Sequence, residues 1–341
     1  MRSYMLHSKK IRYQRIMIIA IGVVLIIGSV VSTETAAQGN GKPTRLEKPV
    51  SNPVTSAAYQ ALLQQISQIA QVSKGEVGVA AIDLRTGTRV EFNANEAVSL
   101  ASTFKVPLAA YAMHLAEQGK LTLTEPVHVK REDMIEPGVL YDHFRHAGTM
   151  ISILNAIELS VSISDNSATD VVFRSVGGPA GVNAWLRQRG HPHINVGAKI
   201  LKDRFAGPDS SNPSGLLVDT SVLLSPTPVA VVNFLADLHK GHIINARNTA
   251  LLLEIMSRTV GERISAQLPP GVKVLHKTGT IIGSHATVND IGYIQMPDGG
   301  WVAIAVYIKQ SPLTVSHGTR DKVIGGISRS IYDYFVLTSV R

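Results

Sequence analysis

The sequence predicts an α+β fold, an α/β-α sandwich in which one antiparallel sheet with flanking helices stands beside an all-helical lobe. Five strand-like runs support this, two near the start of the folded chain and three near its end: 77–83, 88–93, 273–277, 287–296 and 301–308. Between about 103 and 268 the pattern changes to helical runs broken by glycine and proline. Strands at both ends that enclose a helical centre are expected to pair in one sheet, which leaves a cleft between two lobes.

The first 37 residues have the composition of a secretory signal. Five basic residues precede the uncharged apolar run 16–31, and a small-residue stretch ending in Ala36 and Ala37 follows it. An apolar run of 16 residues is short for a membrane span, so export is favoured over a retained N-terminal membrane anchor. Residues 38–55, which contain Gly39, Gly41 and Pro43, are expected to form a flexible lead-in.

The remaining range, 56–341, is expected to form a single domain. Its sheet lobe should comprise 56–102 and 269–341, and its helical lobe 103–268. Apolar residues at helical spacing predict an amphipathic helix from Ala57 to Ala70 and a last helix over 323–335. Gly87 marks a hairpin turn between the first two strands, and Pro297–Gly300 marks the turn between the last two.

Composition excludes several classes of protein. The signal segment carries a net +4, which leaves +4 of the total +8 on the rest of the chain. That is an ordinary solvated surface, so no nucleic-acid partner is expected. The chain has no cysteine, which excludes disulfides, thiol catalysis and Cys-ligated metals. Neither H-E-x-x-H nor G-x-S-x-G occurs, and no metal or cofactor is expected.

Ser102-Thr103-Phe104-Lys105 is the only S-x-x-K in the chain, and it opens a predicted helical stretch that runs to Ala116. Residues i and i+3 share a helix face, so the Lys105 amine is expected to lie against the Ser102 hydroxyl. A serine nucleophile needs a neighbouring base, and a lysine can supply one. Taken alone, the motif is equally compatible with a helix-start serine followed by a solvated lysine.

Two further motifs follow in order. Ser164-Asp165-Asn166 is typical of a turn or a helix N-cap, and Lys277-Thr278-Gly279-Thr280 stands at the end of a predicted strand. Each has an unremarkable structural explanation by itself. Three unique motifs in this order and in matching contexts indicate a catalytic site.

With these motifs the chain resembles the serine β-lactamases and penicillin-binding proteins, and among them most closely the class A β-lactamases. The resemblance extends from about residue 56 to 338, so that it implies a β-lactamase/DD-peptidase-like catalytic domain. It also includes four further runs: Glu136–Leu140, Ser164–Thr169, Gly177-Gly178 with Val182-Asn183, and Thr287–Ile291.

The resemblance implies a role for each matching residue. Ser102 would be the nucleophile, Lys105 its general base or proton relay, and Ser164 the donor of a proton to the leaving nitrogen. Backbone N–H groups of Ser102 and Thr280 would form the oxyanion hole. Asp165 would have a structural role, with bonds inside its own turn.

The resemblance likewise implies a set of residues around the substrate. Asn166 would bind the substrate's side-chain amide, while Lys277 and Thr278 would face its carboxylate and help the proton relay, which makes Lys277 a catalytic residue as well. Gly279 and Thr280 would also bind the substrate. Arg263 stands 14 residues before Lys277, where several class A enzymes have a carboxylate-binding arginine. A surface helix charge explains Arg263 equally well.

The chain departs from the class A pattern at the carboxylate that activates the deacylating water. No Glu occurs between Glu158 and Glu254, and the corresponding stretch, about 195–228, contains only Asp203, Asp209 and Asp219. Asp209 is the candidate base, although a Gly-Pro-Asp turn explains it as well. General-base catalysis tolerates little misplacement, so deacylation is expected to be slow.

The expected function is therefore hydrolysis of β-lactams such as penicillins and cephalosporins through an acyl-Ser102 intermediate. The alternatives are a D-Ala-D-Ala carboxypeptidase-like enzyme that acts on cell-wall peptides and a slowly deacylating β-lactam sensor. The expected partner is the small-molecule or peptide substrate alone. A monomer is expected in the periplasm or outside the cell, with membrane contact only through an uncleaved N-terminal segment.

Overall fold

The computed structural model describes residues 53–197 and 225–339. The expected signal segment 1–37 and nearly all of the lead-in, 38–52, lie outside the described residues. The lead-in was expected to end at 55, whereas the first helix, α1, spans Pro53–Gln71.

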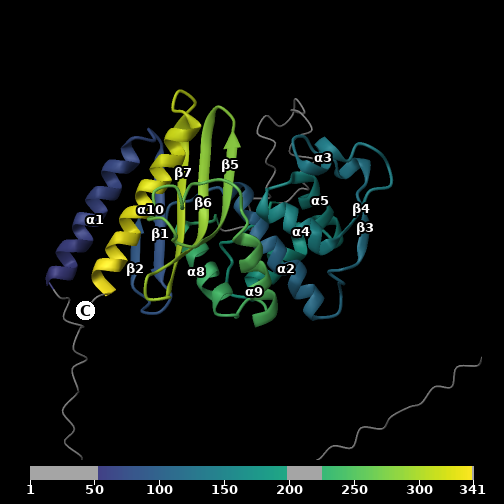
Figure 1. Ribbon diagram of the computed structural model, residues 1–341, viewed down its shortest axis with the longest axis horizontal. Helices are drawn as coiled ribbons and strands as arrows, with labels where there is room; N and C mark the ends of the chain where they lie inside the picture. Colours follow the sequence, from purple (N-terminus) through teal and green to yellow (C-terminus); the bar gives the residue numbers. More distant parts are fainter. Residues whose placement is uncertain (1–52, 198–224, 340–341) are drawn as a thin grey trace, which may run out of the picture. The chain divides into compact units, whose positions relative to one another are not determined.

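A five-stranded antiparallel sheet confirms the prediction that both ends of the folded chain build one sheet (Figure 1). Its strands stand in the order β2-β1-β7-β6-β5, so that β2 and β5 are the two edges. Their bounds are Glu76–Asp83 for β1, Arg89–Phe92 for β2, Val274–Ile282 for β5, His285–Gln295 for β6 and Trp301–Pro312 for β7.

Helices cover both faces of this sheet because its central strands are apolar on both sides. Along β1, Val79 and Ala81 pack with α1 and with α10 (His317–Ser339), which lie side by side over one face (Figure 1). The alternate residues, Ala80 and Ile82, pack with α8 (Pro228–His239) on the other face. This is the period-two alternation of a strand that is buried on both faces.

The helical lobe lies beyond β5 and takes in most of the helices between the two halves of the sheet (Figure 1). Polar side chains fix several helix starts, with Ser152, Asp165, Thr227 and Asn245 each accepting a backbone N–H. The elements outside the sheet and its covering helices are η1 (Ala101–Phe104), α2 (Lys105–Glu117), β3 (Pro126–His128), η2 (Arg131–Asp133), α3 (Val139–His143), β4 (Met150–Ser152), α4 (Ile153–Ser162), α5 (Asn166–Ser175), α6 (Pro179–Gln188) and α9 (Ala246–Met256).

Two elements differ from the sequence expectation. Lys277 was placed at the end of a strand, but β5 continues to Ile282 because Thr278, Gly279 and Thr280 all pair with β6. The α8 helix belongs to the range expected for the helical lobe, yet it packs against β1 and β7 of the sheet. Over the described ranges, no helix combines the length and the apolar character needed to cross a membrane.

Candidate active site

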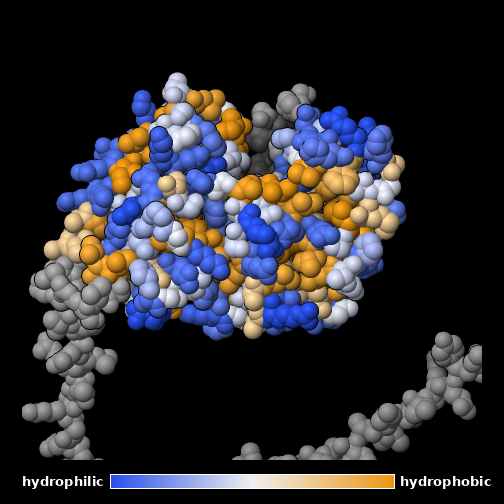
Figure 2. Space-filling view, viewed as in Figure 1, coloured by the Kyte–Doolittle hydropathy of each residue, from blue (hydrophilic) through white to orange (hydrophobic). Residues whose placement is uncertain are grey.

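The three motifs come from three different parts of the fold. The face of the molecule in Figure 2 is hollowed between the β5 side of the sheet and the helical lobe. Ser102 lies in η1, which packs against β5 and β6. Ser164 precedes α5 in the helical lobe, and Lys277 lies within β5. Lys105 and Ser164, 59 positions apart in the chain, meet through the packing of α2 against α5.

Ser102 follows a residue whose backbone is held in an unusual conformation. Ala101 has a φ of 46°, in the left-handed region that costs a non-glycine residue about 1–3 kcal/mol. The conformation is held from β6, where Asn289 Nδ2 donates to Ser99 O at 2.9 Å and to Leu100 O at 3.3 Å. Asn289 thus anchors the turn that presents Ser102, which is half-buried at the start of the helical stretch.

Lys105 is completely buried, and its amine reaches the second motif. Lys105 Nζ donates to Ser164 O at 2.8 Å, to Ser164 Oγ at 3.2 Å and to Asn166 Oδ1 at 2.9 Å. The first motif is therefore connected to the second through the lysine amine. An amine in contact with the Ser164 hydroxyl can pass a proton to it, which is the chemistry of a relay.

The turn at Ser164 is also strained and is stabilised by its neighbour. Ser164 has a φ of 61°, and Asp165 caps α5 by accepting from Ala168 N at 2.8 Å. The expectation that Asp165 has a structural role is confirmed by this bond. Its other oxygen accepts from Leu140 N at 3.0 Å, so Asp165 also ties the turn to α3.

The β5 strand brings the third motif against the first at a glycine. A Cβ on Gly279 would lie 3.0 Å from the Cβ of Ala101 and would overlap the side-chain amide oxygen of Asn289. Only glycine allows β5 to approach Ala101 this closely. Thr280 follows Gly279 and Ser102 follows Ala101, so these two residues lie on facing segments. The backbone N–H groups named for the oxyanion hole belong to these two residues.

Lys277 is a buried cation on the same strand. Its side chain is fully buried, and Nζ donates to Thr278 O at 2.9 Å. Burial lowers the pKa of Lys277 to about 7, an effect that the negative charge of Asp290 opposes and the positive charge of Arg263 reinforces. Near neutral pH the site therefore changes its charge by one unit at Lys277.

Arg263 is buried, not exposed as a surface charge would be, with 6% of its surface accessible. Its Nε donates to Asp321 Oδ1 of α10 at 2.8 Å, and its Nη1 donates to Gly279 O and Asn289 O at 2.8 Å each. Its Nη2 contacts Thr280 Oγ1 at 2.8 Å and His317 Nε2 at 3.2 Å. The guanidinium thereby links β5, β6 and α10.

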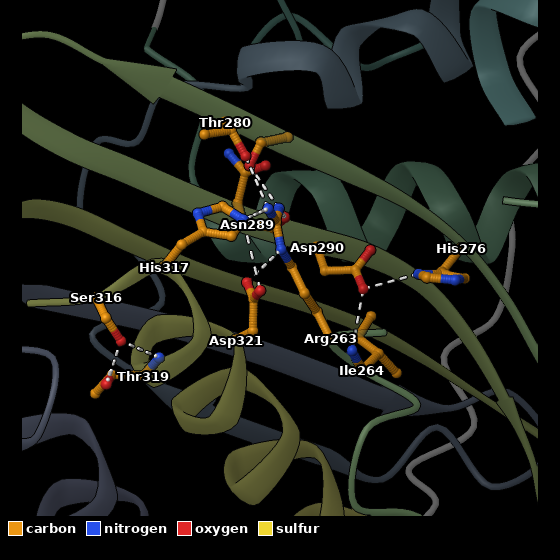
Figure 3. Close-up of polar contacts among 11 residues, drawn as sticks. Arg263, Ile264, His276, Thr280, Asn289, Asp290, Ser316, His317, Thr319 and Asp321 are labelled. Carbon is orange, nitrogen blue, oxygen red and sulfur yellow. Dashed lines mark hydrogen bonds and ion pairs between the residues drawn. The ribbon is translucent and has the colours of Figure 1, made fainter. Parts of the chain in front are cut away.

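Sequence reasoning assigned no role to several residues that hold these groups in place. Asp290 accepts from Ile264 N at 3.0 Å and from His276 Nδ1 at 2.8 Å, next to Arg263 (Figure 3). Two adjacent polar residues in an otherwise apolar strand, Asn289 and Asp290, were the available sign of such a function. His317 and Asp321 had no comparable sign, because they stand more than 50 residues from Arg263.

The structure gives no placement for the candidate deacylation base. Asp209, with Asp203 and Asp219, lies outside the described residues. Within the described ranges, no three His, Cys, Asp or Glu side chains are grouped so as to hold a metal ion.

Comparison with known proteins gives matches along nearly the whole described chain. The model of the Beta-lactamase enzyme family matches residues 61–335. The extended-spectrum β-lactamase PER-1 of Pseudomonas aeruginosa is 28% identical over 289 residues, which cover 82% of this chain and 89% of the relative. The β-lactamase SME-1 of Serratia marcescens is also 28% identical, with 79% and 87% covered. The solved structure of a β-lactamase from Chitinophaga pinensis has a TM-score of 0.70 at 27% identity and covers 80% of this chain and 98% of its own.

Proposed function

Because the chain belongs to the Beta-lactamase enzyme family, we propose that Ser102, Lys105 and Ser164 open the β-lactam amide through an acyl-Ser102 intermediate. The chain is a serine β-lactamase of the class A-like type. The observation that carries the assignment to these residues concerns Lys105, which stands three residues after Ser102. Its buried amine donates hydrogen bonds to Ser164 and Asn166. The peptidase alternative is not favoured, because the matching relatives are β-lactamases.

In the acylation step, Lys105 acts as the neutral amine, which donates two hydrogen bonds and keeps a lone pair. Its Nζ takes the proton of Ser102 Oγ as that oxygen attacks the carbonyl carbon. The carbonyl oxygen gains negative charge, which the N–H groups of Ser102 and Thr280 stabilise. When the intermediate collapses, the C–N bond breaks and the nitrogen takes the proton of the Ser164 hydroxyl. Lys105 restores that proton across its 3.2 Å contact with Ser164 Oγ, and an ester of Ser102 remains.

Four cationic or polar positions support binding of the substrate. Lys277 and Thr278 on β5 would face the carboxylate of the β-lactam, with Arg263 behind them, and Gly279 would let the strand approach Ser102 closely. Asn166, whose Oδ1 accepts from Lys105, would bind the side-chain amide of the substrate through its NH₂ group. The substrate is a small molecule, and no cofactor enters these steps.

Deacylation is proposed to be the slow step, with Asp209 as the candidate base. When a chromogenic cephalosporin is mixed in excess with the enzyme, we expect a burst of product of about one equivalent per enzyme and then a slower steady rate. The acyl-enzyme should be visible by intact mass spectrometry. Asp209→Asn should lengthen the lifetime of the adduct without changing the burst rate. Rapid turnover that persists in Asp203→Asn, Asp209→Asn and Asp219→Asn would show that no carboxylate of this stretch activates the water.

The depressed pKa of Lys277 predicts a pH dependence of substrate capture. Lys277 carries its charge below about pH 7 and loses it above, so kcat/KM toward carboxylate-bearing β-lactams should fall as the pH rises through about 7. Lys277→Arg stays charged throughout, and its profile should remain level to about pH 9. A level wild-type profile from about pH 6 to about pH 9 would contradict the role of Lys277 in carboxylate binding.

We further propose that residues 1–37 direct export to the periplasm or the cell exterior and that 56–341 acts as one monomeric catalytic domain. A retained segment that anchors the protein to the membrane is the alternative. Fractionation of cells that express the full chain, with N-terminal sequencing of the mature protein, separates the two. Cleavage after Ala37 supports the signal peptide, whereas an intact N-terminus in the membrane fraction supports the anchor.

A further inference from the structure

Arg263 has no N–H group left for a substrate in the structure as it stands. A guanidinium has five N–H donors. One bonds Asp321, two bond the carbonyls of Gly279 and Asn289, and two contact Thr280 Oγ1 and His317 Nε2 (Figure 3). If Arg263 binds the carboxylate of a β-lactam, one of these five partners has to leave.

His317 is the partner that can leave most readily. Asp321 forms an ion pair with Arg263, and the two carbonyls are fixed within β5 and β6. The His317 side chain, in contrast, is 54% exposed and belongs to the first residue of α10. Its ring can turn into solvent without moving the backbone, and the bond that is lost is the longest of the five.

The contact distances also indicate how His317 bonds. Nε2 lies 3.2 Å from Arg263 Nη2 and 3.5 Å from Asp321 Oδ2. The shorter contact is to the guanidinium, whose N–H groups can only donate, so Nε2 is the acceptor in this hydrogen bond. His317 therefore occupies one of the two positions around Nη2 where a carboxylate oxygen would accept.

The nitrogen that His317 covers also contacts a residue that is assigned to the substrate side of the site. The same Nη2 contacts the hydroxyl of Thr280, an exposed residue of β5 whose backbone N–H is assigned to the oxyanion hole. A carboxylate placed beside Thr280 could accept from Nη2 and from this hydroxyl together. Charge-assisted bonds to a carboxylate are about twice as strong as bonds between neutral groups, so an anionic group can displace the imidazole.

We propose that His317 is a specificity-determining residue that holds Nη2 of Arg263 until a substrate carboxylate displaces it. This inference rests on the proposed function and deepens it, because it names the residue against which the substrate carboxylate competes. A substrate without a carboxylate leaves His317 in place and gains nothing from Arg263. The free energy needed to break the contact between His317 and Arg263 is subtracted from the binding free energy of every carboxylate-bearing β-lactam.

The test separates binding from chemistry by stopped-flow measurement of acylation. For benzylpenicillin, His317→Ala should lower the dissociation constant of the noncovalent complex about three- to tenfold and leave the first-order acylation rate unchanged. His317→Gln, whose amide oxygen can accept from Nη2, should retain the wild-type constant. With benzylpenicillin methyl ester, which has no carboxylate, wild type and His317→Ala should not differ.

Two controls make the result specific. His317→Ala should have no effect when Arg263 is already alanine, which a double-mutant cycle measures directly. His242→Ala, which removes an exposed histidine that also contacts an aspartate, should behave as wild type. Thermal unfolding midpoints of all variants exclude a general loss of structure.

Failure of this inference differs from failure of the proposed function. A wild-type protein that no β-lactam acylates would contradict the function. Normal acylation with an unchanged or raised dissociation constant in His317→Ala would overturn the role of His317 alone. An equal change with the methyl ester would also overturn it, since the effect would then not depend on the carboxylate.

Discussion

A protein that carries Ser102→Ala is expected to form no covalent adduct with benzylpenicillin or a cephalosporin. Of the two hydroxyls in the first motif, that of Thr103 is buried and donates to Leu100 O at 2.6 Å. The Ser102 hydroxyl is therefore the group expected to become an ester, and no cysteine exists to replace it. Intact mass spectrometry should therefore show the free protein mass at every time point. In wild type, peptide mapping should place the adduct on Ser102.

The control for this experiment is Ser257→Ala, which removes an exposed serine just after α9. It should form the adduct at the wild-type rate. An adduct that persists in Ser102→Ala, or that maps to another residue in wild type, would overturn the assignment of the nucleophile. The substitution removes one oxygen from a half-buried position, so little change in the unfolding midpoint is expected.

The second large effect is expected at Lys105, where loss of the amine should slow acylation by about two orders of magnitude or more. Without the amine, Ser102 loses the group assigned to take its proton, and Ser164 Oγ loses the 3.2 Å contact through which it is reprotonated. Lys105→Met is the informative variant, because it keeps most of the buried side-chain volume. The acylation rate is measured by rapid mixing with mass detection.

Lys105 is also a buried structural cation, so the experiment needs a stability readout. Its removal leaves Ser164 O and Asn166 Oδ1 without their donor, which should lower the unfolding midpoint. Lys120→Ala, at an exposed position after α2, is the matched control and should change neither quantity. A Lys105→Met protein that remains folded and is acylated at the wild-type rate would rule out Lys105 as base and as relay.

The sequence alone determined the elements and the order of the motifs. Strand alternation at both ends of the chain predicted the antiparallel sheet, because a period of two and the flanking turn residues are local properties. The i, i+3 spacing of Ser102 and Lys105 and the capping role of Asp165 are local as well. For the same reason, the matching relatives could be anticipated from short motifs.

Only the tertiary structure decided what surrounds these groups. The amine of Lys105 bonds residues about 60 positions away, and Asn289 holds the turn before Ser102 from a strand nearly 190 positions away. Arg263 is surrounded by β5, β6 and α10, so His317 and Asp321 could not be foreseen. Side-chain contacts between distant segments depend on how the lobes pack, and a single sequence carries no periodic pattern from which that packing can be read.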